Sequence, residues 1–373
     1  MAQSRGAAVR QAAVIARFQN GGNAVEIAAD FIDHLLFVPV RVNQGQPSLF
    51  ELDTTASASS IDPARAAELG LTRLSSAQMN LSGLDISFAQ LASVPQAEFG
   101  ARFGRPYQGT LGNDFLSAVV ARIDYARQTM QLYDPTAYKY AGHGKSLRVT
   151  FVDGLPVVKA KAIVEGQSID ADFIVNTALA APVLIFDHYA GARRISLRKS
   201  ISAASMPLLQ AENDALGRLD RFQLGPYSVE ASLVVFSKQA PPAASDSKLA
   251  GEIGAEMLRR FGVVIDYSRQ QILLDPNSEF NSEDFEDMSG LTVVAGGANL
   301  KQFMITDVRP STPGAEAGLR KGDVIEGIDG DPAAELSLPD IHRLFRLLGP
   351  PHPLVITRNG KTFTVNLRMH RLL

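Results

Sequence analysis

The sequence predicts a mainly β protein in which one β-rich unit is used twice and is followed by a smaller α/β unit. Three observations predict this class. One segment occurs twice, short apolar runs with alternating polarity dominate residues 24–278, and the pattern changes after an acidic stretch at residues 277–287. Such alternation is typical of half-buried strands. The 373 residues also exceed what one hydrophobic core usually serves.

Composition excludes several classes of function. Hydrophobic residues make up 46% and charged residues 20%, with a net charge of -3, so we expect no nucleic-acid partner. There is no cysteine, which excludes disulfides and thiolate sites but leaves the redox compartment open. We expect no transmembrane segment. Arg10 and Arg17 interrupt the apolar part of the N-terminal extension, residues 1–23, so it is not a typical signal peptide.

The repeat gives the most information about organisation. Residues 109–135 read GTLGNDFLSAVVARIDYARQTMQLYDP, and residues 251–276 read GEIGAEMLRRFGVVIDYSRQQILLDP. A repeat at this spacing indicates one structural unit used twice. A second pair of related segments precedes these in the same order, at residues 38–57 and 156–180. Each of them reads as a strand, a tight turn around Gly45 or Gly166, and a second strand.

Each of these earlier segments ends with an acid or amide followed by Thr: Asp53-Thr54 in the first and Asn176-Thr177 in the second. An aspartic peptidase needs two carboxylates a few ångströms apart that share one proton and hold a water between them. A twofold-related pair of Asp-Thr-Gly loops supplies that geometry. A tandem β unit with an acid-Thr or amide-Thr loop in each copy is the arrangement that such chemistry would require.

Residues 24–278 resemble the bacterial aspartic peptidases that carry two retropepsin-like, or pepsin-like, β-barrel lobes in one chain. The resemblance implies a first lobe at residues 24–140 and a second at residues 145–278. The match rests on Asp53-Thr54-Thr55-Ala56-Ser57 against the Asp-Thr-Gly-Ala-Ser loop, on Thr110-Leu111-Gly112 and Glu252-Ile253-Gly254 against the hydrophobic-hydrophobic-Gly segments, and on Asn176-Thr177-Ala178 against the second Asp-Thr-Gly.

The resemblance places Asp53, Thr54, Asn176 and Thr177 in the catalytic loops and implies that the two Thr hydroxyls brace the loops against each other. Asn176 stands where the second acid belongs, and an amide neither releases nor accepts a proton near neutral pH. Gly is also lost from both loops, to Thr55 and Ala178, which would crowd the backbone or exclude a conformation that depends on Gly.

The departures predict a pseudoprotease, a lobe pair that folds and binds an extended peptide without cleaving it. One alternative is an active endopeptidase in which Asp53 works alone while Asn176 orients the water. Another is that the lobes are inert scaffold and Asp53 is a solvated or capped carboxylate.

Residues 279–285 are predicted to form an acidic, solvated linker, and residues 286–373 resemble a PDZ domain of the bacterial protease-associated kind. The segment Ala317-Gly318-Leu319-Arg320-Lys321-Gly322-Asp323-Val324-Ile325 is the most specific part of this match. The resemblance implies that a peptide adds as a strand to a sheet edge and that a tight loop holds its carboxylate. The residues assigned to this binding are Ser289, Gly290, Leu291, Thr292 and Val293. His342 is expected either at the groove or, with more weight, exposed on its helix.

The expected partners are therefore peptides or protein C-termini. The six histidines are scattered without metal-ligand spacing and no G-x-S-x-G motif occurs, so neither a metal nor another cofactor is predicted. Relatives of this architecture are usually exported, which implies the periplasm or the cell surface, although the N-terminus itself gives no support for export.

Overall fold

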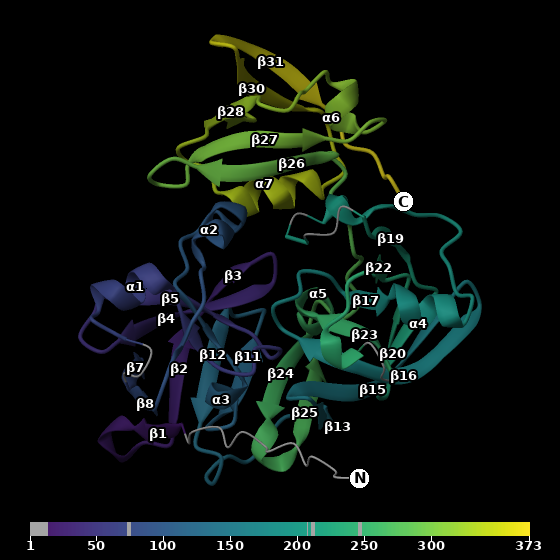
Figure 1. Cartoon of the computed structure of the whole chain (residues 1–373). Helices are drawn as coiled ribbons and strands as arrows, with labels where there is room; N and C mark the ends of the chain where they lie inside the picture. Colours follow the sequence, from purple (N-terminus) through teal and green to yellow (C-terminus); the bar gives the residue numbers. More distant parts are fainter. Residues whose placement is uncertain (1–13, 73–75, 207, 210–212, 245–247) are drawn as a thin grey trace, which may run out of the picture.

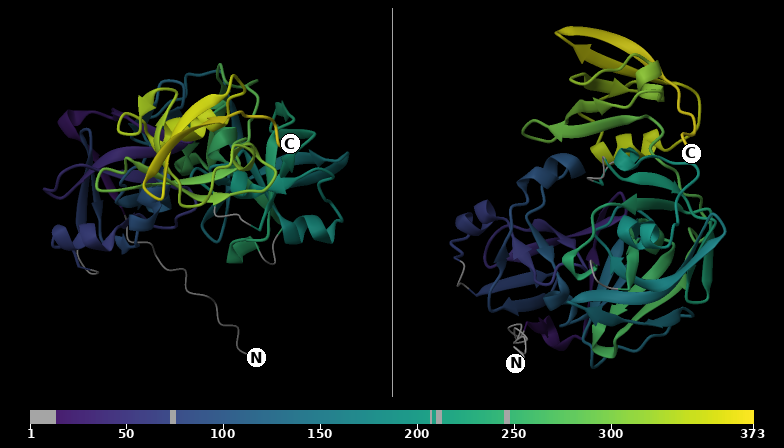
Figure 2. Two further views of the ribbon diagram at one scale, coloured as in Figure 1. Left: turned by 90° about the horizontal axis from the view of Figure 1, so that it is seen from above. Right: turned by 45° about the vertical axis from the view of Figure 1, so that its right-hand side comes forward.

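The computed structural model describes residues 14–72, 76–206, 208–209, 213–244 and 248–373, and this part of the chain is mainly β. We refer to residues 14–140 as the first half, to residues 145–278 as the second half and to residues 286–373 as the C-terminal unit. The two halves lie side by side, and the C-terminal unit lies across the top of both (Figure 1 and Figure 2). No helix in the described ranges is long and apolar enough to cross a bilayer.

The first half is built on a sheet with the order β1-β8-β7-β4-β5-β10-β6-β9, and β3 also pairs with β4. In β4 the buried Val38, Val40 and Val42 alternate with the exposed Pro39 and Arg41, as the sequence predicts. The elements are β1 (Ile15–Phe18), β3 (Asp30–Ile32), β4 (Leu35–Val42), β5 (Ser48–Leu52), β6 (Ser60–Ile61), α1 (Pro63–Glu68), β7 (Ala77–Leu81), β8 (Leu84–Phe88), β9 (Ala92–Ser93), α2 (Ala97–Phe103), β10 (Gly109–Leu111) and α3 (Asn113–Leu116), with the 3-10 turn η1 (Gln19–Gly21).

The second half has a larger sheet with the order β18-β19-β22-β17-β23-β16-β15-β20-β21, and β14 pairs with β15. The predicted turn at Gly166 is confirmed, because Val164 pairs with Gln167 across Glu165 and Gly166, whose φ angles are 50° and 75°. The elements are β14 (Thr150–Val152), β15 (Leu155–Val164), β16 (Gln167–Asn176), β17 (Val183–Phe186), α4 (Asp187–Ala192), β18 (Ile201–Ser202), η2 (Ala203–Ser205), β19 (Ala215–Arg218), β20 (Arg221–Leu224), β21 (Tyr227–Glu230), β22 (Leu233–Ser237), η3 (Pro242–Ala244), β23 (Leu249–Gly254) and α5 (Ala255–Leu258).

The repeated segments meet in a third sheet, which has the order β13-β25-β24-β11-β12-β2. Strands β11 and β24, one from each copy of the repeat, pair antiparallel with Ile123 opposite Val263. An antiparallel pairing of two copies of the same segment relates the halves by an approximate twofold axis. The strands are β2 (Ala24–Ala28), β11 (Val120–Asp124), β12 (Thr129–Tyr133), β13 (Lys145–Arg148), β24 (Phe261–Asp266) and β25 (Gln271–Pro276), with η4 (Tyr267–Arg269) between the last two.

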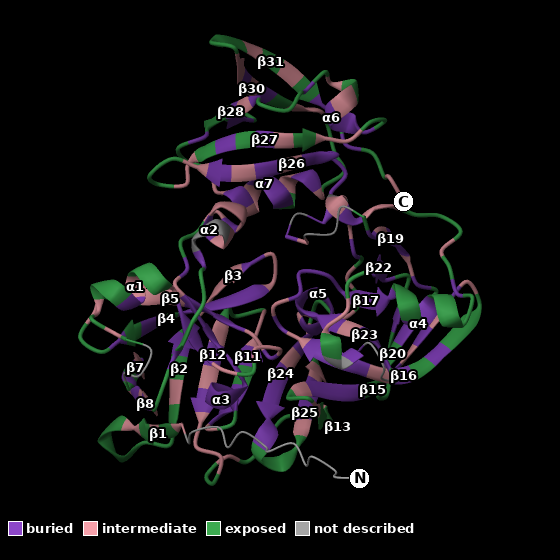
Figure 3. Cartoon of the chain, in the orientation of Figure 1, coloured by how far each residue is buried: buried purple, intermediate pink, exposed green. Residues whose placement is uncertain are grey.

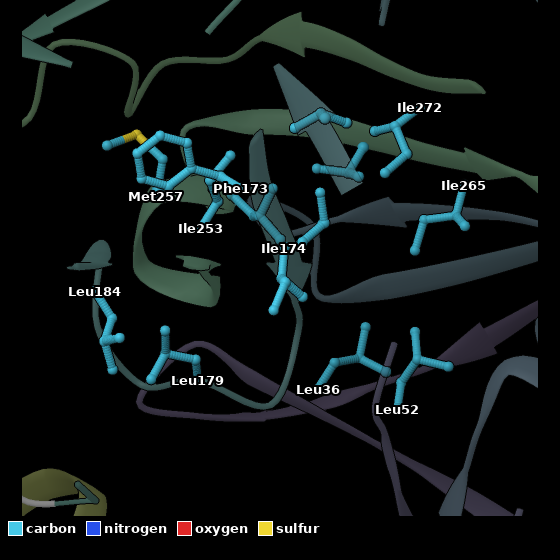
Figure 4. Close-up of a cluster of buried hydrophobic side chains, with 14 of the residues drawn as sticks. Leu36, Leu52, Phe173, Ile174, Leu179, Leu184, Ile253, Met257, Ile265 and Ile272 are labelled. Atoms are coloured by element: carbon cyan, nitrogen blue, oxygen red, sulfur yellow. The ribbon is translucent and has the colours of Figure 1, made fainter. Parts of the chain in front are cut away.

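One hydrophobic core spans both halves. Leu36 and Leu52 from the first half belong to the same buried cluster as Leu179, Ile253 and Ile265 from the second (Figure 4). Exposed residues gather instead on α1, α4 and the ends of hairpins (Figure 3). The halves therefore share apolar burial that neither would have alone, which favours their folding together.

The C-terminal unit has its own core and a sheet with the order β26-β27-β28-β30-β31, to which β29 adds at β28. Asn359 and Gly360 form the predicted hairpin turn, with φ angles of 49° and 74°. Ser337 and Asp340 form a capping box at the start of α7. The elements are β26 (Leu291–Gly296), β27 (Gln302–Val308), α6 (Pro313–Glu316), β28 (Val324–Ile328), β29 (Asp331–Pro332), α7 (Leu338–Phe345), β30 (His352–Arg358) and β31 (Lys361–Leu367).

The acidic stretch between the second half and the C-terminal unit is solvated only in part, because Glu279 and Glu283 are exposed whereas two of its other acids are not. Asp284 and Glu286 are buried, at 2% and 0% exposure. The second half supplies their counter-charges: Arg260 Nη2 lies 2.5 Å from Asp284 Oδ1, and Arg218 Nη2 lies 3.0 Å from Glu286 Oε2. Buried charges need such partners, and these pairs fix the C-terminal unit to the second half.

Candidate functional site

The loops that follow β5 and end β16 meet at the twofold axis through their Thr residues. The backbone N–H of Thr54 donates to Thr177 Oγ1, and that of Thr177 donates to Thr54 Oγ1, both at 3.1 Å. Each hydroxyl then donates across the axis, Thr54 to the carbonyl of Val175 and Thr177 to that of Leu52, both at 2.6 Å. Both Thr side chains are buried, so these four bonds lock the two loops together away from water.

Asp53 and Asn176 occupy equivalent places beside this lock. Asp53 Oδ1 accepts the N–H of Thr55 at 2.7 Å and its hydroxyl at 2.6 Å, and Asn176 Oδ1 accepts the N–H of Ala178 at 2.9 Å. Neither Thr55 nor Ala178 has a positive φ. These two positions therefore do not need Gly for their backbone conformation, contrary to what the sequence suggested.

The carboxyl of Asp53 is half-buried. Burial raises its pKa, while the hydrogen bonds from Thr55 and from the backbone of Ala56 act in the opposite direction. A carboxyl in such a place can change its protonation state at a higher pH than a solvated aspartate. When ionised, Asp53 is therefore a stronger base than a solvated aspartate.

Two further acids lie close to these loops, and the residue pattern did not single them out. Asn176 Nδ2 donates to Glu252 Oε2 at 2.6 Å, which places a carboxyl directly on the amide that replaces the expected acid. Glu51 lies on β5 two residues before Asp53 and is buried. The one signal in the sequence was that Glu252 occupies a position where the hydrophobic-hydrophobic-Gly pattern has an apolar residue.

Burial raises the pKa values of both Glu51 and Glu252, and the negative charge of Asp53 raises each of them further. The hydrogen bond from Asn176 lowers the pKa of Glu252, and one from Tyr107 lowers the pKa of Glu51. The groups that shift the pKa values of these acids include no Lys or Arg. Carboxyls that are buried together without a cation favour the protonated state on all but one of them.

Each loop passes close to the backbone of a neighbouring strand end. A Cβ on Gly112 would lie 2.7 Å from the carbonyl oxygen of Ala56, and a Cβ on Gly254 would lie 2.0 Å from that of Ala181. Strand β10 runs parallel to β5, and β23 runs parallel to β16, so the two Gly residues hold equivalent places in the two halves. These contacts fix the position of the strand that carries Glu252 relative to the Asn176 loop.

In the C-terminal unit, the backbone N–H groups of Ser289 and Leu291, in and directly after the loop before β26, already have acceptors. The N–H of Ser289 donates to Asp287 Oδ1 at 2.8 Å, and the N–H of Leu291 donates to Ser289 Oγ at 3.0 Å. Thr292 and Val293 follow in β26, which is an edge strand of its sheet in the described residues. A peptide carboxylate that used the N–H of Ser289 would have to replace the carboxylate of Asp287.

Residues 304–358 match the family model of the PDZ domain. The chain contains a PDZ domain. One solved structure with a similar segment is that of the photosystem II D1 C-terminal processing protease, at 28% identity over 23% of this chain and 23% of that chain, with a TM-score of 0.21. The comparison with curated proteins finds no match. The predicted peptide-binding residues 289–293 lie outside the matched stretch, with residues 294–303 between them.

The first half contacts the strand that the sequence resemblance assigns to peptide binding. Helix α2 packs against β26, and η2 of the second half also contacts this strand. Gly104, at the C-terminal end of α2, lies so close to α7 that a Cβ on it would be 2.7 Å from Leu338 Cβ. A long peptide that added along β26, as the resemblance implies, would have to displace this helix.

His342 is not exposed on its helix, so that expectation for it is wrong. It is 3% exposed, and its Nδ1 lies 2.8 Å from Asp33 Oδ2 in the turn between β3 and β4. Arg346 Nη1 lies 3.3 Å from Asp33 Oδ1. Burial acts to raise the pKa of Asp33, but Arg346 and His342 hold it well below its usual range. Helix α7 therefore binds the first half through a buried charge cluster.

Metal binding has no support in the part of the chain that the structure describes, where no group of three or more His, Asp or Glu residues could hold an ion.

Proposed function

We propose that this protein binds peptides at two places, in a cleft between two retropepsin-like lobes and in the PDZ domain. The observation that carries the proposal for the lobes is the reciprocal bonding of Thr54 and Thr177, because it brings equivalent loops of a repeated unit together on a twofold axis. The PDZ domain supports peptide binding by its family. We propose lobe boundaries at residues 24–140 and 145–278.

The two-aspartate mechanism is not open to this cleft as the sequence stands. In that mechanism two equivalent carboxyls share one proton, and Asn176 cannot take part because an amide does not titrate in this range. The amide can still orient a water or a substrate carbonyl. Peptide binding is therefore the primary proposal, and a pseudoprotease or regulatory role follows from it.

Hydrolysis that uses Asp53 is the second candidate function. One observation favours it: Thr55 holds Asp53 in a half-buried place where burial raises its pKa, which makes the ionised carboxylate a stronger base. In this reading the PDZ domain recruits the C-termini of substrates. A location in the periplasm or at the cell surface is part of the proposal and rests on the resemblance alone.

The test is equilibrium binding of mixed-sequence peptides of about ten residues to the intact protein, with either free or amidated C-termini. Binding that amidation weakens reports on the PDZ domain. Binding that amidation leaves unchanged, and that a statine-containing peptide displaces, reports on the cleft, because statine mimics the tetrahedral intermediate of peptide hydrolysis. Binding of the first kind alone would overturn the proposal for the lobes, and no binding of either kind would overturn it altogether.

A further inference from the structure

We propose that Glu252 supplies the second carboxyl of the cleft in place of residue 176, so that Asp53 and Glu252 act as an acid and base pair in peptide hydrolysis. This inference rests on the proposed binding of peptides between the lobes and goes beyond it, because it restores a chemistry that Asn176 alone would remove.

The geometry assigns Glu252 to this position. Strand β23 runs parallel to β16 with Glu252 opposite Ile174 and Gly254 opposite Asn176, so Glu252 is fixed two residues before the end of its strand, beside the loop. Asn176 Oδ1 accepts the N–H of Ala178, which leaves Nδ2 to donate to Glu252 at 2.6 Å. The two bonds together fix the orientation of the amide. The carboxyl therefore lies on the atom of Asn176 that is not used by its own loop.

The equivalent position in the first half shows that this acid is specific to the second. Thr110 lies opposite Glu51 on the paired strands β10 and β5, as Glu252 lies opposite Ile174 on β23 and β16. The repeat therefore places Thr110 where the second half has Glu252. The half that has lost its loop acid has gained one on the neighbouring strand, while the half that keeps Asp53 has none at that strand position.

An amide at residue 176 is chemically matched to a carboxyl at residue 252. An aspartate there would place a third acid within hydrogen-bond distance of Glu252 and close to Asp53, and like charges in a buried site disfavour ionisation. The N–H of Asn176 instead binds one oxygen of Glu252 and leaves the other free to carry a proton. Burial and the charge of Asp53 both raise the pKa of Glu252, and burial also raises the pKa of Asp53, so the two carboxyls together resist losing both protons.

The proposed reaction consumes one water and returns both carboxyls to their starting states. The water oxygen attacks the peptide carbonyl carbon while Asp53 accepts a proton from that water. Glu252 gives its own proton to the carbonyl oxygen. The resulting diol then collapses as the C–N bond breaks. Asp53 passes its proton to the leaving amine nitrogen, and a diol hydroxyl returns a proton to Glu252. The products are a carboxylic acid and an amine.

The experiment follows cleavage of a mixed library of unmodified peptides by mass spectrometry between about pH 3 and pH 8. The variants are D53N, E252Q and the double variant N176D/E252Q, with E230Q as the matched control because Glu230 is exposed on β21. We expect the wild type and E230Q to cleave equally. D53N and E252Q should each lose about 100-fold or more of the rate, the usual contribution of a general acid or base.

Rescue separates a chemical role from a structural one. N176D/E252Q returns the acid to residue 176, so we expect at least about tenfold more activity than E252Q alone, with a changed pH profile. Full activity in E252Q together with loss in D53N would overturn the assignment of Glu252. A wild type that binds the statine-containing peptide but cleaves nothing would also overturn it and leave the binding function intact. Failure to bind that peptide would instead refute the cleft itself.

Discussion

Replacing Thr54 by Val tests the lock between the two loops. Val keeps the shape of Thr but removes the hydroxyl, so the variant loses the bond to the carbonyl of Val175 and the bond that Thr54 Oγ1 accepts from Thr177 N–H. Thr54 is 0% exposed, so no water can replace these partners. Each of the two buried groups left without a partner costs about 1–3 kcal/mol, which predicts a loss of about 2–6 kcal/mol in the free energy of unfolding.

Urea unfolding followed by far-UV circular dichroism measures this loss. Thr150→Val is the matched control, because Thr150 lies exposed on β14 and its change should stay within about 0.5 kcal/mol. The double variant T54V/T177V removes all four bonds, and we expect its loss to differ from the sum of the two single losses because the loops share one geometry. A change below about 0.5 kcal/mol in Thr54→Val would refute the proposed lock.

Three other predictions concern the PDZ domain and its attachment. Gly104→Ala should push α2 away from Leu338 and raise the peptide affinity of the PDZ domain. The control is Gly70→Ala, which has the same φ of 65° but lies in open space and should leave the affinity unchanged. Equal peptide affinities of the two variants would contradict this prediction. Arg260→Met should lower the free energy of unfolding by about 3–5 kcal/mol, measured by thermal unfolding, because Asp284 keeps only the more distant Arg259 as a cation and two part-buried carbonyls lose their donor. A loss below about 1 kcal/mol would contradict this prediction. His34→Gln should be more stable than the wild type by a margin that grows as the pH falls from about 6.5 to about 4 and reaches roughly 2 kcal/mol at pH 5. Parallel curves of unfolding free energy against pH for the two proteins would contradict this prediction.

The sign of the His34 prediction follows from its pKa. Burial, with help from Arg259 and Arg346, lowers the pKa of His34 from 6.5 to about 3. Between these values the unfolded chain binds a proton that the folded chain does not, so this group reduces stability as the pH falls through that window. Burial raises the pKa of the nearby Glu256, so this group adds stability as the pH falls, opposite to His34. The difference between the wild type and His34→Gln isolates the contribution of His34.

The repeat and the turns were readable from the sequence because they depend on local pattern. Alternating residues predicted the hairpin at Gly166, and the turn pair Asn359-Gly360 predicted the last one. The repeat predicted one unit used twice, and the structure pairs its copies directly in β11 and β24.

The parts that the sequence did not reveal depend on partners distant in the chain. Glu252 appeared only as a departure from an apolar position, since nothing local shows that it meets Asn176. Asp284 appeared to be a solvated acid because its partner Arg260 belongs to another element. His342 likewise meets Asp33 from the opposite end of the chain. Single-sequence patterns carry no information on such pairings.

Hydrogen exchange of the intact protein with and without a bound statine-containing peptide tests the central claim most directly. Our account predicts protection of backbone amides at residues 53–57, 176–180 and 252–254, because the peptide would lie across both loops and the strand end that carries Glu252. Protection confined to residues 289–296, with none in either loop, would show that the PDZ domain alone binds peptides and would contradict the account.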